Sequence, residues 1–504
     1  MTKSLSRVLL TLALAAPLTA RAQTGDDAFR FAQRSALSTA QSLGNAGVGV
    51  AGRGDLGDLF GNPAGLGLMQ RGAFSIGLNA SNAENESIYS VGGGSGFARS
   101  SEQSATRMGN LSYVYKAPTA RGSLVFGAGL AQVASFNRTL AFEGENGLNS
   151  FTDFLMPLPD EFEFVTEGGE SFPEFSRPLS FIGYETYAID WTGEDVAVPF
   201  APAVSRGTVL QSGLVQETGG ISQFTIGGAF EASRDVMVGF SFNVPYGRYE
   251  FTRLLDEDDF LDDNDGTGGT TDFGYLEFTE GFESRMVGVN LKAGVSAKVN
   301  PKVRLGLSVE TPTFYTIQED YDTVLFTSFD NGDAFEYGDD FDEDAGRGSF
   351  DYEVRTPWRL EAGVAYDAPK FALAADLEFV DWSQLELSSD GFSFSEQNLA
   401  IRQNYESATN LRLGGTYRFD KVHLRAGLAG MIDPRPEAEG ISRDRGVVSL
   451  GLSYLVNNQF AFDLGVMAEA FEDAYRPYRE VADAPLVTEE VLRSYLTLGV
   501  RVGL

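Results

Sequence analysis

The chain has 504 residues, a formal net charge of −33 and no cysteine. The large excess of acidic residues excludes nucleic-acid binding through a basic face. The lack of cysteine excludes disulfides and thiolate metal sites. No segment approaches the ~18 consecutive apolar residues of a transmembrane helix.

The N-terminal segment is typical of a secretory signal peptide. It has a basic start at Lys3 and Arg7, an apolar run over residues 8–18, and the triplet Ala20-Arg21-Ala22. The run is too short to span a bilayer as a helix. We expect residues 1–22 to be a signal peptide.

The next distinctive stretch, residues 42–69, is rich in small residues and contains Gly61-Asn62-Pro63-Ala64-Gly65. Its frequent glycines disfavour helix and strand alike. We therefore expect this stretch to be neither a strand of a sheet nor a long helix.

From residue 72 onward, alternation of period two dominates, which is the signal of β-strands. In residues 286–299, for example, Val287, Val289 and Leu291 share one face, while Asn290 and Lys292 lie on the other. Fourteen such segments follow one another, near residues 73–83, 110–117, 122–134, 221–232, 235–252, 284–299, 302–317, 351–367, 370–386, 406–419, 421–432, 446–456, 459–471 and 491–504.

The connectors between these segments alternate between tight turns and long loops. The longest, at residues 135–220, 253–283 and 318–350, are acidic. An even number of antiparallel strands with short turns on one side and long loops on the other describes a bacterial outer-membrane barrel. The sequence thus predicts an all-β fold, a transmembrane antiparallel β-barrel of about 14 strands over residues 72–504. A soluble β-sandwich or propeller would explain the alternation, but not the leader or the asymmetry of the connectors.

Several motifs resemble those of the FadL/TodX family of outer-membrane transporters. They are Gly44-x-Ala46-Gly47, the run from Asp55 to Leu66 that contains Asn62-Pro63-Ala64, and similar stretches at residues 356–363, 381–383 and 412–427. The resemblance covers most of the chain, although the long acidic loops have no counterpart.

This resemblance implies an N-terminal plug, or hatch, over residues 23–71, with Gly61, Asn62, Pro63, Ala64 and Gly65 as its gate. It also implies passive uptake of hydrophobic molecules, such as long-chain fatty acids or aromatic hydrocarbons, with a lateral exit into the bilayer. Strand pairing could break for that exit at Gly127 and Gly129, or at residues 245–247.

Charged residues on the strands should point into the lumen, because each would cost a few kcal/mol near the lipid midplane. Two roles remain open for them. One is to anchor the plug, through its carboxylates Asp55 and Asp58 or its carbonyls; the other is to bind the carboxylate of a fatty acid. The main candidates are Arg304, Arg359, Glu361, Arg412 and Arg425.

The acidic loops at residues 256–272 and 330–344 are oxygen-rich, as calcium prefers. However, Leu261 occupies the position where an EF-hand would begin with Asp. We expect no cofactor and leave Ca²⁺ binding open. The aromatic residues of these loops could form a capture groove for apolar cargo: Phe260, Phe273, Tyr275, Phe278, Phe335, Tyr337 and Phe341.

The chain is therefore predicted to be a monomeric outer-membrane transporter whose partners are a hydrophobic ligand (a fatty acid or detergent) and membrane lipid. The alternative is a similar barrel that serves as a scaffold or shuttle for secreted proteins. A barrel hydrolase is a third hypothesis, but the lone His423 lies in no catalytic motif, so we expect no enzyme activity.

Overall fold

The computed structural model describes residues 25–504, except 36, 93, 168–169, 194–196, 206, 265–271, 339–345 and 437–439. The predicted signal peptide at residues 1–22 lies outside the described residues.

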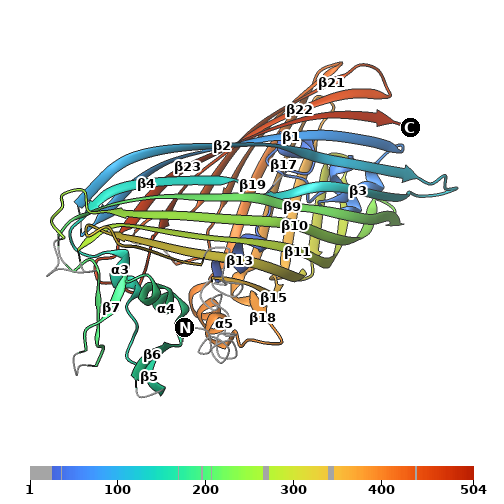
Figure 1. Cartoon of the computed structure of the whole chain (residues 1–504). Helices are drawn as coiled ribbons and strands as arrows, with labels where there is room; N and C mark the ends of the chain where they lie inside the picture. The colour runs from blue at the N-terminus through green and yellow to red at the C-terminus, as the bar shows by residue number, and fades with distance from the viewer. Residues whose placement is uncertain are drawn as a thin grey trace.

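The described residues form a closed antiparallel barrel of 14 strands (Figure 1), as the alternation predicted. The first and last strands close it, with Ala73 opposite Gly503 and Ser90 opposite Leu486. Three of the 14 are each broken into two pieces, β3 with β4, β12 with β13 and β15 with β16. The wall consists of β1 (Ala73–Val91), β2 (Gly94–Lys116), β3 (Leu124–Ser135), β4 (Arg138–Asn146), β9 (Val209–Ser233), β10 (Val236–Asp258), β11 (Phe273–Asn300), β12 (Val303–Glu310), β13 (Phe314–Phe329), β15 (Arg347–Arg355), β16 (Arg359–Asp367), β17 (Phe371–Asp381), β19 (Ser407–Arg418), β20 (Val422–Met431), β21 (Arg445–Leu455), β22 (Phe460–Tyr475) and β23 (Leu486–Gly503).

Burial along each strand follows the predicted alternation, with apolar side chains outside and polar ones inside. On β11, Val287, Val289 and Leu291 are exposed, while Asn290 and Lys292 are buried in the lumen. An apolar outer surface and a polar interior are what a bilayer requires of a barrel.

The longest strands of the wall, β2, β9, β10 and β11, extend well past the strand ends predicted from the sequence. β11 begins at Phe273, and β4 lies inside the range 135–220, both in regions predicted as connectors. Because about 9–11 residues suffice to cross a membrane at a tilt, strands of 23 to 28 residues extend beyond it.

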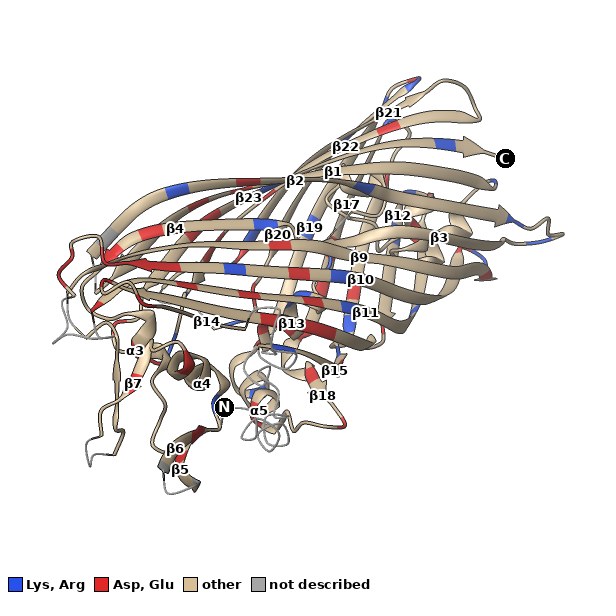
Figure 2. Ribbon diagram, viewed as in Figure 1, with Lys and Arg blue, Asp and Glu red and all other residues tan. Residues whose placement is uncertain are grey.

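One end of the barrel carries the helices and small hairpins, and the other has only short turns and the C-terminus (Figure 1). Acidic side chains gather toward the helix-bearing end (Figure 2). A buried apolar cluster that includes Phe151, Phe273 and Phe278 closes that end. The short elements at this end of the barrel are α3 (Phe151–Leu155), β5 (Phe162–Glu167), β6 (Glu170–Phe175), α4 (Pro178–Glu185), β7 (Ile189–Trp191), β8 (Phe200–Pro202), β14 (Ala334–Tyr337), η6 (Trp382–Gln384), β18 (Glu386–Ser388) and α5 (Ser395–Asn404).

Residues 25–71, called the plug below, fill the lumen. The plug contains α1 (Gly25–Ala32), α2 (Ala40–Leu43), η4 (Leu56–Leu59) and η5 (Pro63–Leu68). α1 lies against α5 near the helix-bearing end, and η5 packs on β9, β10 and β11. The described part of the chain contains no helix that is both long and apolar enough to cross a membrane.

Candidate transport pathway

The motif Asn62-Pro63-Ala64 joins the plug to the wall. Asn62 caps η5 by accepting a hydrogen bond from Ala64 N at 3.0 Å, and Pro63 occupies the first turn, where no amide hydrogen is needed. The Asn62 side-chain nitrogen donates to the carbonyls of Val50 (2.7 Å), Val295 and Leu307 (both 3.2 Å). Asn62 is almost fully buried, so one side chain connects two parts of the plug with β11 and β12.

Glycines in the wall allow this close approach. A Cβ atom at Gly294 would collide with the Asn62 side chain, and one at Gly306 would collide with the Val50 carbonyl. Sequence reasoning missed these residues. The signal that could have revealed them is a glycine at an inward-facing position of an otherwise regular strand.

The predicted lumen residues lie around the plug. Arg304 donates to Gly52 O (3.0 Å) and Arg359 to Ala32 O (2.5 Å), while Arg412 pairs with Glu378 and, at 3.5 Å, with Glu361. In a separate contact, Arg425 donates to Ser453 Oγ on the neighbouring strand (2.6 Å).

The two plug carboxylates predicted as anchors, Asp55 and Asp58, bind within the plug. Asp58 accepts hydrogen bonds from the backbone of Arg53, Gly54 and Asp55, and the Arg53 side chain contacts Asp55 at 3.3 Å. Burial and the neighbouring Asp55 charge raise the pKa of Asp58 to about 7, against the opposing effect of Arg53. Arg304 and Arg359, which reach the plug from the wall, bind its carbonyls instead.

Two wall acids that the strand alternation predicted to point inward also hold the plug. Asp376 Oδ2 accepts from Gly49 N (2.6 Å) and Val50 N (3.0 Å), and Glu310 pairs with Arg34 (2.6 Å). Both were visible as inward-facing acids, but their partners lie more than 270 residues away in the chain.

A buried apolar cluster rich in aromatic rings, called the chamber below, lies where α1 of the plug packs against the wall, η6 and α5. Phe29 of α1 meets Trp382 with ring centroids 4.7 Å apart, and Phe31 packs edge-on to Phe136 and Tyr249. The chamber is the buried cluster of Ala28, Phe29, Phe31, Ala32, Val133, Ala134, Phe136, Ile221, Tyr249, Met286, Tyr315, Ile317, Tyr352, Val354, Val380, Trp382, Leu385, Leu387, Phe394, Ile401, Tyr405 and Ala408. Four of these residues, Ala28, Phe29, Phe31 and Ala32, belong to α1, so in this structure the side chains of α1 fill the chamber.

The loop aromatics predicted to form a capture groove take other positions. Phe273 and Phe278 are fully buried in the cluster that closes the helix-bearing end, and Phe335 and Tyr337 pack against it. Phe260 is exposed, and Phe341 lies outside the described residues.

Strand pairing breaks on one side of the barrel. β2 pairs with β3 only from Asn110 to Lys116, and with β4 only at Phe97. Among the described residues, 98–109 of β2 have no ladder partner on that side. We call this interruption, facing residues 132–142, the seam. The chain kinks beside it at Phe136-Asn137, between β3 and β4.

The predicted exit positions lie elsewhere. Gly127 and Gly129 are both paired with β2, and Pro245 remains opposite Gln223 in the ladder between β10 and β9. The interrupted pairing therefore lies beside the break between β3 and β4, and not at these glycines.

Side chains bridge the seam in place of a ladder. The carbonyl of Thr139 accepts from Ser101 Oγ (2.5 Å) and Asn85 Nδ2 (3.2 Å), and that of Ala141 accepts from Ser87 Oγ (2.5 Å). β4 thus lies behind the β1–β2 hairpin, and the seam is closed by polar contacts.

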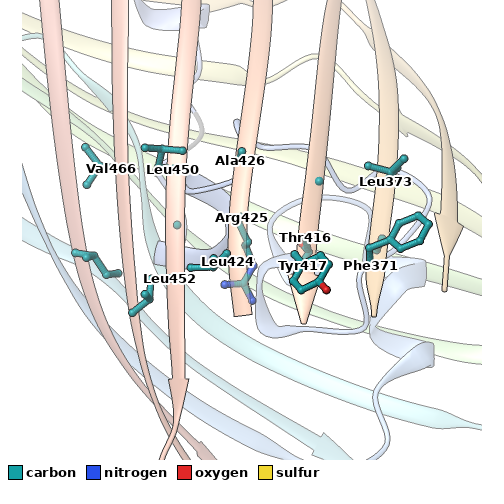
Figure 3. Close-up of a pocket in the computed structure, with 14 residues that line it drawn as sticks. Phe371, Leu373, Thr416, Tyr417, Leu424, Arg425, Ala426, Leu450, Leu452 and Val466 are labelled. Atoms are coloured by element: carbon teal, nitrogen blue, oxygen red, sulfur yellow. The ribbon is translucent and has the colours of Figure 1, made fainter. Parts of the chain in front are cut away.

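Other hollows lie outside the lumen. The hollow in Figure 3, about 840 Å³, is lined by outward-facing residues that include Phe371, Leu373, Tyr417 and Leu450. It belongs to the lipid-facing surface. His423 lies on β20 opposite Arg418.

Calcium binding and the capture groove were both predicted for the acidic loops. Parts of these loops, residues 265–271 and 339–345, lie outside the described residues. Among the residues that the structure describes, no group of three or more acidic or histidine side chains is placed to hold a metal ion. Calcium binding stays a prediction.

Together, the closed barrel, the apolar outer surface and the filled lumen are typical of an outer-membrane barrel with a plug. A family model described as outer membrane protein transport protein (OMPP1/FadL/TodX) matches residues 222–475. The chain belongs to this family, as the motifs had indicated, and the family's members are transporters of hydrophobic compounds and not enzymes.

Solved structures share the fold. The Pseudomonas putida toluene transporter TodX is 15% identical, with a TM-score of 0.51 over 94% of this chain and 99% of that one. A Pseudomonas aeruginosa FadL homologue is 13% identical, with a TM-score of 0.53 over 94% and 98%. No curated protein sequence matches the chain.

Proposed function

We propose that this protein admits hydrophobic small molecules, long-chain fatty acids among them, into the aromatic chamber and releases them sideways at the seam into the outer membrane. The single observation that carries this proposal is the adjacency of the two features. Val133, Ala134 and Phe136 line the chamber and lie at the kink that forms the seam. An apolar solute gains free energy from such a chamber and would stall in a water-filled pore.

A second cargo class, aromatic hydrocarbons, is favoured by the chamber's composition. Its rings offer edge-to-face partners for an aromatic solute. The arginines beside it are already paired, Arg30 with Asp27 and Arg359 with Glu378, which favours uncharged cargo over a free carboxylate.

The test is uptake by vesicles that contain the purified protein, measured in parallel with a labelled long-chain fatty acid and with labelled toluene. We expect faster entry than into protein-free vesicles, and slower entry after Trp382→Ala, which removes a chamber wall. Trp358→Ala is the matched control, because Trp358 is half-exposed on the outer surface. Equal entry with and without protein, for both cargoes, would contradict the proposal.

The gate role of Gly61, Asn62, Pro63, Ala64 and Gly65 is part of this proposal. Deletion of residues 61–65 should change the uptake rate if the plug controls passage. The alternative, a scaffold for secreted proteins, predicts no cargo uptake in either form. We also propose that the protein acts as a monomer, since one chain contains both chamber and seam.

A further inference from the structure

A buried ion cluster lies behind the seam. Arg138 is the first residue of β4, next to the kink, and its guanidinium pairs with Glu489 of β23 and, at 3.4 Å, with Glu217 of β9. Glu489 is 2% exposed, and it also accepts a hydrogen bond from Asn85 of β1 at 2.6 Å. The Arg138–Glu489 pair therefore reaches from β4, behind β1, to the strand on the far side of β1.

The plug takes part in the same cluster. Arg30 of α1 contacts Glu217 at 3.5 Å and lies over the ring of Tyr249, 4.6 Å from its centroid. The Tyr249 hydroxyl donates to the same Glu217 oxygen at 3.1 Å. Glu217 is thus shared by an arginine of the plug and an arginine of the kinked strand.

We propose that Arg138 is a latch that holds the seam closed, and that α1 controls the latch through Glu217. Removing one partner of a buried ion pair is destabilising, because it leaves an uncompensated charge. When cargo displaces Phe31 and α1, Arg30 leaves Glu217, and Arg138 is then the arginine that both buried carboxylates, Glu217 and Glu489, must share. Its pairing with Glu489 weakens, and β4 separates from the β1–β2 hairpin. The chamber and the seam thereby open in order. The transport consequence rests on the proposed function; the latch itself does not.

The latch is tested by distance measurement across the seam. Since the chain has no cysteine, the pair Gln103→Cys and Thr139→Cys, whose parent side chains touch at 3.4 Å, can carry two spin labels. The expected result is one short distance in the parent protein and a broadened, longer distribution after Arg138→Gln. Arg138→Lys keeps the charge and should restore the short distance.

Arg30→Gln tests the link to the plug, because Arg30 touches no residue of the seam in this structure. It should broaden the distribution in the same direction as Arg138→Gln. The matched control is Arg99→Gln, which removes an exposed pair with Glu143 across the same seam and should leave the distribution unchanged. An unchanged distance in folded Arg138→Gln overturns the latch, and an unchanged distance in Arg30→Gln overturns its control by α1. If Arg138→Gln does not fold, the Arg30→Gln result decides.

Transport provides a separate readout. We expect Arg138→Gln to raise the uptake rate about fivefold, the ratio that corresponds to about 1 kcal/mol, and a disulfide between the two cysteines to abolish the increase until it is reduced. If the parent protein shows no uptake, the proposed function fails while the distances still decide the latch. If Arg138→Gln lengthens the distance between the labels at positions 103 and 139 but leaves the uptake rate unchanged, the seam is not the exit for cargo.

Discussion

At the scale of single residues, Asn62 carries the attachment of the plug. Asn62→Ala would remove the hydrogen bonds that Asn62 donates to the carbonyls of Val50, Val295 and Leu307, and would remove the cap of η5. We expect the docking of η5 to weaken by about 1–3 kcal/mol, with the barrel unchanged.

Hydrogen exchange over residues 61–69 should accelerate in Asn62→Ala, while the melting temperature of the β-sheet stays constant. Asn82→Ala is the control, since Asn82 lies on β1 away from the plug and bonds exposed side chains. Unchanged exchange over residues 61–69 would show that the plug is held by its other contacts.

The wall glycines allow a second prediction. Gly294→Ala places a methyl group against the Asn62 side chain and should speed exchange of η5 as Asn62→Ala does. Gly430→Ala, at a strand position with nothing within 4 Å, should have no such effect. If both substitutions are neutral, the plug tolerates a shift that the structure does not indicate.

The direction of a lumen side chain could be predicted from the sequence, but its partner could not. Alternation along β16 and β17 indicates that Arg359 and Asp376 point inward, because a charge on the lipid face is costly. The contacts of Asp376 with Gly49 and Val50 depend on how the plug lies inside the closed barrel, and a pattern along one strand contains no such information.

At the scale of elements, α1 fills the chamber, and Trp382 can report on it. In a background with Trp191→Phe and Trp358→Phe, Trp382 is the remaining tryptophan of three. Phe29→Ala removes the ring packed on it and should shift its emission to longer wavelength, because water enters the space. Phe371→Ala on the outer wall should not.

A hydrophobic cargo that displaces α1 should alter the emission of this single-tryptophan protein in the same saturable way at increasing concentration. A signal that rises linearly, as it would for partition into detergent or lipid, would count against binding in the chamber.

The strands were predictable, whereas their interruptions were only partly so. Residues 302–317 and 351–367 each read as one strand, but Pro312 and Pro357 divide them into β12–β13 and β15–β16. Proline cannot donate to a ladder, which accounts for both breaks, although Pro245 stays within the ladder between β10 and β9. The kink at Phe136-Asn137 has no such marker. It follows from the register of β4 against β9 and from contacts with distant strands.

At the scale of the whole molecule, charge accumulates on the outer surface beyond the lipid-facing band. Glu84 lies opposite Glu102, and Glu490 lies opposite both Glu86 and Glu472. Like charges directly across a ladder destabilise it, and salt screens exposed charges.

Raising NaCl from about 0.01 to about 0.5 M should therefore increase the melting temperature, by about 2 °C or more. Circular dichroism in neutral detergent measures this, with sucrose of equal osmolality as the control. An increase of the same size in sucrose would assign the effect to solvent exclusion instead of to charge.

The ladder between β1 and β23 joins the first strand of the barrel to its last, which is 18 residues long. The barrel therefore closes only when β23 is present, and a chain that lacks this strand presents two bare sheet edges. Such edges invite pairing with other chains. The topology thus makes concealment of both edges depend on one strand, distant from β1 in the sequence.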